Sequence, residues 1–201
     1  VTPTKSNLLA LKRQLGFAEE GYDLLEQKRQ LLIFELMRRL DQARAAEDTL
    51  AKALGKAFAS LKEALLDLGA EALDRASLAV HLDQQVTVTY QHLMGLKLPR
   101  LSARTEPAGT QFGLGGTSAH TDSAMDSFVE TLPVLASLAE LQTSVSRLAR
   151  ELRKTQRRCN ALSKIFIPSY RETIAYIAGA LEERERESFI IIKMVRNRLV
   201  V

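Results

Sequence analysis

Residues 138–199 carry the pattern of one very long helix, and this pattern constrains the fold more than any other feature. Apolar or small residues recur at alternating spacings of three and four, which are the a and d positions of a coiled coil. These residues are Leu138, Leu141, Val145, Leu148, Leu152, Thr155, Cys159, Leu162 and Phe166. Because such a helix is too long for an ordinary globular core, we expect a lever, a spacer or a shaft.

The seam of this helix changes phase near Pro168 and then ends in charge. It resumes as Tyr170, Ile174, Ile177 and Leu181, and the run Leu181–Glu187 follows. A proline inside a helix costs about 3 kcal/mol, so the phase change predicts a local bend or a change of supercoil. Arg184 and Glu187 occupy seam positions. The two-helix seam has therefore ended there, or every side of the helix faces another surface.

A second long helix is predicted over residues 4–68. Its apolar stripe is Leu11, Leu15, Ala18, Tyr22, Leu25, Leu32 and Leu36, then Leu50, Leu54, Ala57, Phe58, Leu61, Leu65 and Leu68, with Arg29 at one seam position. Thr2 or Thr4 is a candidate N-cap, and Gly69 is placed to end the helix. At 1.5 Å per residue this helix would be about 95 Å long, matching the C-terminal one. Two such helices in one chain are expected to pair antiparallel.

The middle of the chain has a different pattern. A short helix is expected near 70–79, and the alternating segments Val86–Tyr90 and Leu96–Leu98 predict a small β-hairpin. A loop rich in turn formers follows, at Pro107, Gly109, Gly113, Gly115 and Gly116. Residues 121–123 supply N-caps for the second long helix, which begins or kinks at Pro133. The prediction is a mainly α chain with three parts: 1–69, a long helix; 70–120, a short helix and hairpin covering the closed end; and 121–201, a long helix.

Composition fits long helices and excludes several classes of protein. The chain of 201 residues has few aromatic residues, no Trp and a net charge of +4. One cysteine rules out an intrachain disulfide framework and suits a reducing compartment. No apolar run reaches the ~20 residues that span a bilayer, and no secretory leader is visible, so we expect a cytoplasmic protein without membrane insertion.

No residue pattern predicts catalysis, a cofactor or a metal. His81, His92 and His120 lack Cys or carboxylate neighbours at ligand spacing, and we interpret them as surface residues. Cys159 occupies a seam position, where a thiol acts as a small apolar side chain. Gly113–Gly116 lacks the Lys-Ser/Thr of a phosphate loop and is better explained as a turn.

One basic cluster could meet a polyanion. It consists of Arg147, Arg150, Arg153, Lys154, Arg157 and Arg158, interrupted by the single acid Glu151. Nucleic-acid binding would favour interleaved aromatic or groove-reading side chains, and none is present. Docking to an acidic protein surface is the favoured interpretation.

Several segments together resemble the D subunit of the V-type and A-type rotary ATPases. They are Pro3–Leu9 with Gly21, Leu24–Leu25 and Lys28–Arg29; Gly95–Pro99 and Gly116–Ala119; and Leu141–Val145, Thr155–Leu162, Ile167–Pro168, Thr173–Ile177, Leu181–Phe189 and Lys193. The resemblance covers essentially the whole chain. Cys159 in place of a more usual Val, and an unusually apolar 189–192, depart from the family pattern.

The resemblance implies a central rotor shaft without catalytic residues or a cofactor. In this family the paired helices enter a ring of catalytic A and nucleotide-binding B subunits, and the middle segment contacts the F subunit and the C socket (d in eukaryotes). Implied ring contacts are Arg13, Arg184, Arg186 and Glu187, and implied F or socket contacts are Val86, Val88, Tyr90, Leu96 and Leu98. On the residues alone, a generic coiled-coil adaptor and a basic nucleic-acid-binding coiled coil remain alternatives.

Overall fold

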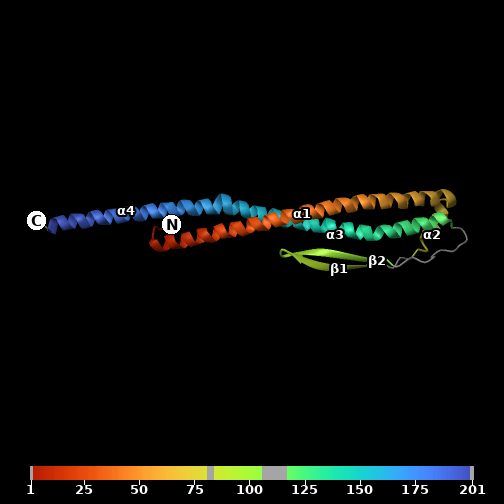
Figure 1. Ribbon diagram of the computed structural model, residues 1–201, viewed down its shortest axis with the longest axis horizontal. Coiled ribbons are helices and arrows are strands. Elements are labelled where there is room, and N and C mark those ends of the chain that lie inside the picture. The colour runs from red at the N-terminus through yellow and green to blue at the C-terminus, as the bar shows by residue number, and fades with distance from the viewer. Residues whose placement is uncertain (1, 81–83, 106–116, 200–201) are drawn as a thin grey trace. The chain divides into compact units, whose positions relative to one another are not determined.

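The computed structural model describes residues 2–80, 84–105 and 117–199 (Figure 1). Its elements are α1 (Lys5–Leu68), α2 (Ala70–Ser77), β1 (Gln84–Leu93), β2 (Leu96–Thr105), α3 (Ala119–Ala161), the π-helical turn η1 (Leu162–Phe166) and α4 (Ile167–Leu199). The predicted mainly helical fold, with a short helix and a hairpin between two long helices, is confirmed. His81 and the predicted turn formers 107–116 lie outside the described residues.

The chain divides into two compact units, of residues 1–32 with 151–201 and of residues 33–150. In the first unit the beginning of α1 packs antiparallel to α4 and to the last turns of α3. Lys5 and Glu19 of α1 pair with Glu185 and Arg171 of α4, and Lys28 pairs with Glu151 of α3, so rising residue numbers along α1 meet falling numbers on its partners. Antiparallel pairing buries Leu32 and Ile177 completely.

The second unit pairs the rest of α1 with α3 in the same antiparallel sense. Lys56 lies 3.9 Å from Glu130, and Glu63 lies 3.3 Å from His120 near the closed end. Ala57, Ala64 and Leu148 are fully buried, and their seam is completed by small residues that let the backbones approach closely. Phe58 is largely exposed, yet its ring meets Phe128 edge-on at 5.4 Å.

The ends of the helices form where the sequence places the caps. Thr4 Oγ1 accepts the backbone N–H of Asn7 at 3.3 Å, and Gly69 ends α1 with a φ of 77°. The second long helix begins at Ala119, two residues earlier than predicted, and the hydroxyls of Ser118 and Thr121 lie 3.4 Å apart at its start. This helix continues through Pro133, so it does not begin there.

The phase change near Pro168 has a structural cause. The N–H of Ile167 donates to the carbonyl of Leu162, five residues earlier, which closes the π turn η1. A π turn inserts one residue into a helix, and the wider turn stands directly before the proline that lacks an N–H. The seam therefore passes from Cys159 to Ile167, which is 8% exposed. The prediction that Phe166 lies in the seam was wrong, because this side chain is 48% exposed.

Similarly, Ala64 takes the seam position that we predicted for Leu65. Ala64 is fully buried, whereas Leu65 is 43% exposed. In the second unit the short helix α2 lies at the closed end, where Leu73 and Val80 line a pocket of about 350 Å³ with Leu61 and Met125.

The hairpin runs along α3, and the prediction that it covers the closed end was wrong, because β2 is bonded to Glu140 and Arg147 in the middle of that helix. Its strands pair antiparallel from Gln84 opposite Thr105 to Leu93 opposite Leu96, and Met94 and Gly95 both have positive φ in the two-residue turn. The outer edge of β2 is bonded to α3, because the carboxylate of Glu140 accepts the N–H of Leu101 at 2.7 Å. This bond and the one that Arg147 donates to the backbone carbonyl of Lys97 hold the hairpin beside α3 (Figure 1).

Candidate partner-binding surfaces

No metal centre is assembled in the part of the chain that the structure describes. There, no group of three or more His, Cys, Asp or Glu side chains is arranged to hold a metal ion. No helix among these residues is long and apolar enough to cross a membrane. His120 lies between Glu63 and Asp67 at the surface, and His92 is exposed on β1. The surfaces that remain as candidates are for binding other molecules.

The helix pair of the first unit ends well before α4 does. Leu181 is half-buried, and every described side chain of 182–197 is exposed. Lys5 at the start of α1 reaches Glu185 at 3.0 Å, and Arg184 donates to the backbone carbonyl of Pro3 at 3.2 Å. The seam has therefore ended at the charge run, as one of the two sequence interpretations held.

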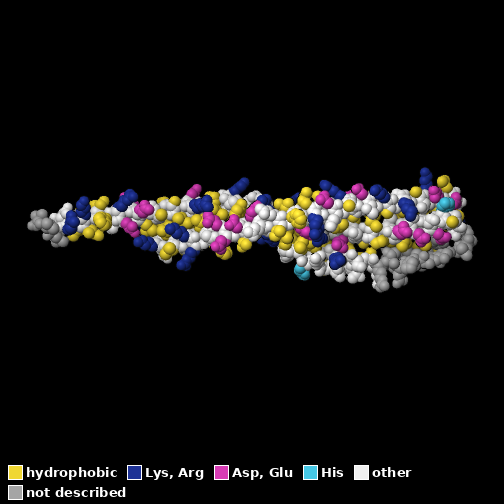
Figure 2. All heavy atoms as spheres, viewed as in Figure 1, with side chains coloured by type: hydrophobic (Ala, Val, Ile, Leu, Met, Phe, Trp, Pro, Cys, Tyr) yellow, Lys and Arg dark blue, Asp and Glu magenta, His cyan; other side chains and the backbone are white. Residues whose placement is uncertain are grey.

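Beyond the charge run, α4 carries an unpaired apolar end. Phe189, Ile190, Ile191, Ile192, Met194 and Val195 are between 51% and 76% exposed. They surround the helix on all sides, since four of them are consecutive. Figure 2 shows their yellow side chains beside Lys and Arg at the C-terminal end of α4. An apolar surface of this kind, unpaired within the described chain, marks a contact with another molecule.

The predicted ring contacts lie at different places in the first unit. Arg186 pairs with Glu183 on its own helix at 3.5 Å, and Glu187 is exposed nearby. Arg13 is exposed on α1 and lines an open groove of about 510 Å³. The groove is bordered by Phe17, 79% exposed, and by the π turn through Phe166. The structure therefore does not bring Arg13 together with the charge run.

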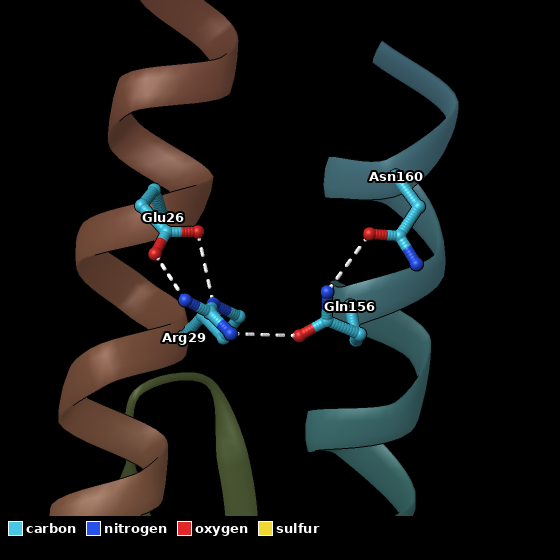
Figure 3. A network of polar contacts seen from close by, with 4 residues as sticks. All are labelled: Glu26, Arg29, Gln156 and Asn160. Carbon is cyan, nitrogen blue, oxygen red and sulfur yellow. Dashed lines mark hydrogen bonds and ion pairs between the residues drawn. The ribbon is translucent and has the colours of Figure 1, made fainter. Parts of the chain in front are cut away.

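A polar layer interrupts the same helix pair at Arg29, in the seam position that the sequence indicated. Figure 3 shows that Arg29 donates two hydrogen bonds to the carboxylate of Glu26. Arg29 also donates to Gln156 of α3 at 3.0 Å, and Gln156 in turn donates to Asn160. The hydrogen bond from Arg29 lowers the pKa of Glu26. Since a polar seam layer is satisfied in one alignment only, it fixes the register of the two helices.

Cys159 lies one turn from this layer and is 2% exposed. Burial raises the pKa of its thiol, which stays neutral and packs as a small apolar side chain. The structural interpretation of this cysteine is thereby supported, since a buried neutral thiol is a poor nucleophile.

The predicted hairpin contacts divide between exposed and buried positions. Val86, Val88 and Tyr90 lie on one face of β1 and are 55%, 47% and 58% exposed. Leu96 is half-buried, and Leu98 is 1% exposed within the chain. Sequence periodicity could not reveal that Leu98 is covered, because its burial depends on the position of the hairpin relative to the long helix.

Comparison with known proteins decides the family. The family model for the D subunit of ATP synthase matches residues 7–197. The chain belongs to the ATP synthase D-subunit family. It is 42% identical over 198 residues to the second V-type ATP synthase D subunit of Treponema pallidum, covering 98% of this chain and 95% of that protein.

Bacterial and archaeal members are similar over equally complete lengths. The V-type ATP synthase D subunit of Thermotoga neapolitana is 34% identical over 199 residues, covering 99% of this chain and 98% of that protein. The A-type ATP synthase D subunit of Methanosphaera stadtmanae is 34% identical over 202 residues, covering 99% and 94%. The chain is therefore a D subunit of a V/A-type ATP synthase, which places it in a multisubunit complex.

Within this D subunit, part of the basic cluster makes contacts inside the chain. Arg147 donates to the backbone carbonyl of Lys97 in the hairpin, and Glu151 forms a 3.3 Å ion pair with Lys28. For the other five basic residues no ion pair is found among the described residues: Arg150, Arg153, Lys154, Arg157 and Arg158.

Proposed function

We propose that this D subunit is the central rotor shaft of its ATP synthase, coupling ATP hydrolysis or synthesis in a surrounding A/B ring to rotation of a membrane ring and ion transport. The observation that supports this most strongly is the end of α4. The apolar seam of α4 ends at Leu181, and its last contacts with the start of α1 are at Arg184 and Glu185. The helix then continues with apolar side chains exposed on every side, which favours an enclosing surface. A ring of A and B subunits supplies such a surface.

The shaft acts mechanically and without a catalytic residue of its own. Long paired helices give it stiffness, and the satisfied polar layer at Arg29 opposes sliding of one helix along the other. An asymmetric shaft contacts each pair of ring subunits differently and thereby favours a different conformation, and a different nucleotide affinity, in each. In this proposal nucleotides bind the ring, and the shaft carries no cofactor.

The contacts fall into two groups. The ring is contacted by the charge run, through Arg184, Arg186 and Glu187, and by Arg13 on α1. The F subunit or the C/d socket is contacted by the hairpin, through Val86, Val88, Tyr90 and Leu96. Leu98 supports these contacts from inside, since it is buried in the chain. The protein is then cytoplasmic and peripheral to the membrane as part of the complex.

Charge reversal in the charge run tests the proposal. In a ring reconstituted from the cognate A and B subunits, Arg184→Glu with Arg186→Glu should lower the shaft's effect on ATP hydrolysis severalfold, because like charges would face the ring. Helix content by circular dichroism should stay unchanged, since both side chains are exposed. The control is Lys52→Glu with Lys62→Glu, which reverses the same charge at exposed positions without described ion pairs.

The outcome separates the proposal from a generic adaptor. A wild-type chain that neither assembles with the ring nor changes its hydrolysis would refute the rotor role. Equal losses in both double variants would mean that net charge, and not the charge run, is responsible. Loss of helix content in the first variant would assign these arginines to the fold.

A further inference from the structure

The strand β1 is attached to the protein along one edge only. The sheet has two strands, so β2 is its sole strand neighbour among the described residues. Every side chain from Gln85 to His92 is exposed, on both faces of the strand. By contrast, β2 contains the buried residues Leu98 and Pro99 and is bonded to α3 by its outer edge.

The pairing shows which backbone groups of β1 point outward. Leu101 is directly opposite Val88, and it gives its N–H to Glu140 of α3, away from β1. This pair is therefore a non-hydrogen-bonded one, whose N–H and C=O groups face away from the ladder on both strands. Lys97, opposite His92, fits the same alternation, because its carbonyl accepts from Arg147.

It follows that Val86, Val88, Tyr90 and His92 present their backbone N–H and C=O groups along the outer edge of β1. No hydrogen bond to these groups is found from any described residue. The edge extends over a strand of ten residues. Such a row of unpaired donors and acceptors is a template for another strand.

The open edge also lacks the usual protection. Natural edge strands carry charged side chains, especially Lys, or a proline that lacks the backbone N–H, and both oppose pairing with a further strand. Here Lys97, Pro99 and Arg100 are all on β2, whose edge is already covered, and β1 contains no charged residue and no proline. Its central run Val86–Tyr90 is β-branched and aromatic, which favours strand formation.

We propose that another protein of the ATP synthase complex adds an extended, acidic strand to the outer edge of β1, so that the hairpin becomes a three-stranded sheet. This inference rests on the proposed function and specifies how the hairpin binds. The charge of the added strand follows from the hairpin, where residues 84–105 contain three basic residues and no acidic one. A second copy of this chain fits poorly, because two basic hairpins would lie side by side.

A proline at an outward position tests the mode of binding. Val88→Pro removes one outward N–H and leaves the hydrogen bonds between β1 and β2 in place, since proline is tolerated where the N–H faces solvent. The matched control Val88→Ala removes the side chain and keeps the N–H. We expect Val88→Pro in the full-length chain to weaken binding of the cognate F subunit or of the socket protein, each measured alone, by about tenfold or more relative to Val88→Ala.

Hydrogen exchange of single amides gives an independent readout. In the free chain the N–H groups of Thr87 and Thr89 point to β2 and should exchange slowly, whereas those of Val88 and Tyr90 should exchange fast. In the complex the fast amides should become protected as well. Binding without protection at Val88 and Tyr90, or equal binding by Val88→Pro and Val88→Ala, would overturn strand addition while leaving the rotor role intact.

The charge of the added strand is tested by reversing the charge of the hairpin. Lys97→Glu with Arg100→Glu should weaken binding at least tenfold, and the loss should shrink at high salt. An unchanged affinity would refute the acidic strand. A dimer of the isolated chain that Val88→Pro abolishes would identify a second copy as the occupant and overturn the proposal. A wild-type chain that fails to enter the ATP synthase at all would instead refute the proposed function itself.

Discussion

Replacing Ile177 should destabilise the first unit by about 2–3 kcal/mol. Its side chain is fully buried in the seam of α4, between the half-buried Ile174 and Leu181. Ile177→Ala removes three carbon atoms, worth about 0.8 kcal/mol each in lost burial. Buried aliphatic truncations cost about 2–5 kcal/mol, and a seam of only two helices can partly close around the gap, so the lower part of this range applies.

The measurement combines two probes. Urea unfolding followed by circular dichroism gives the free energy of the full-length chain, and hydrogen exchange along α4 reports the first unit by itself, since two units need not unfold together. The neighbouring Tyr176→Ala is the control, because Tyr176 is 66% exposed and its loss should change stability by about 0.5 kcal/mol or less. Equal effects of the two substitutions would refute the seam as described.

Three further predictions concern single contacts. Because Arg29 lowers the pKa of Glu26, their interaction adds stability above the ordinary carboxyl pKa of 4.5, and this stability is lost as the pH falls. The free energy of unfolding of Arg29→Met should therefore lie below that of wild type at pH 7, and the difference should become smaller below about pH 4. A difference that stays constant from pH 7 to about pH 3 would contradict this. The Cys159 thiol should react with a thiol reagent at about pH 8 far more slowly in the native chain than in urea, because it is buried with a raised pKa, and fast native labelling would disprove its burial. Glu140→Ala should speed amide exchange at Leu101 about tenfold or more while Thr89 stays protected, whereas unchanged exchange at Leu101 would show that Glu140 does not hold the hairpin.

Much of the helical fold could be predicted because coiled-coil seams repeat at short range. Leu148, Ile177 and Ala57 are buried where the spacing placed them, and Arg29 sits in the seam as a satisfied polar layer. The errors arose where spacing alone is ambiguous. Leu65 is more apolar than Ala64, yet the close approach of two backbones selects the smaller residue.

The candidate surfaces were less accessible to sequence reasoning. Whether a strand residue such as Leu98 is buried depends on a hydrogen bond between β2 and a helix far along the chain, from Leu101 to Glu140. The open edge of β1 could not be predicted either, because it follows from which edge of the hairpin α3 binds. The predicted contacts Arg13, Arg184, Arg186 and Glu187 remain predictions.

The π turn before Pro168 also has a genetic consequence. An α-helix rotates by about 100° per residue, so one inserted residue would turn the whole downstream stripe away from α1. The π turn accommodates the inserted residue within Leu162–Phe166, so the apolar residues of Tyr170–Leu181 stay aligned with α1. A single-residue deletion within α4 itself meets no such wide turn, and the stripe beyond it would rotate away from α1. At this one site, a change in chain length is absorbed locally and the helix pair beyond it is preserved.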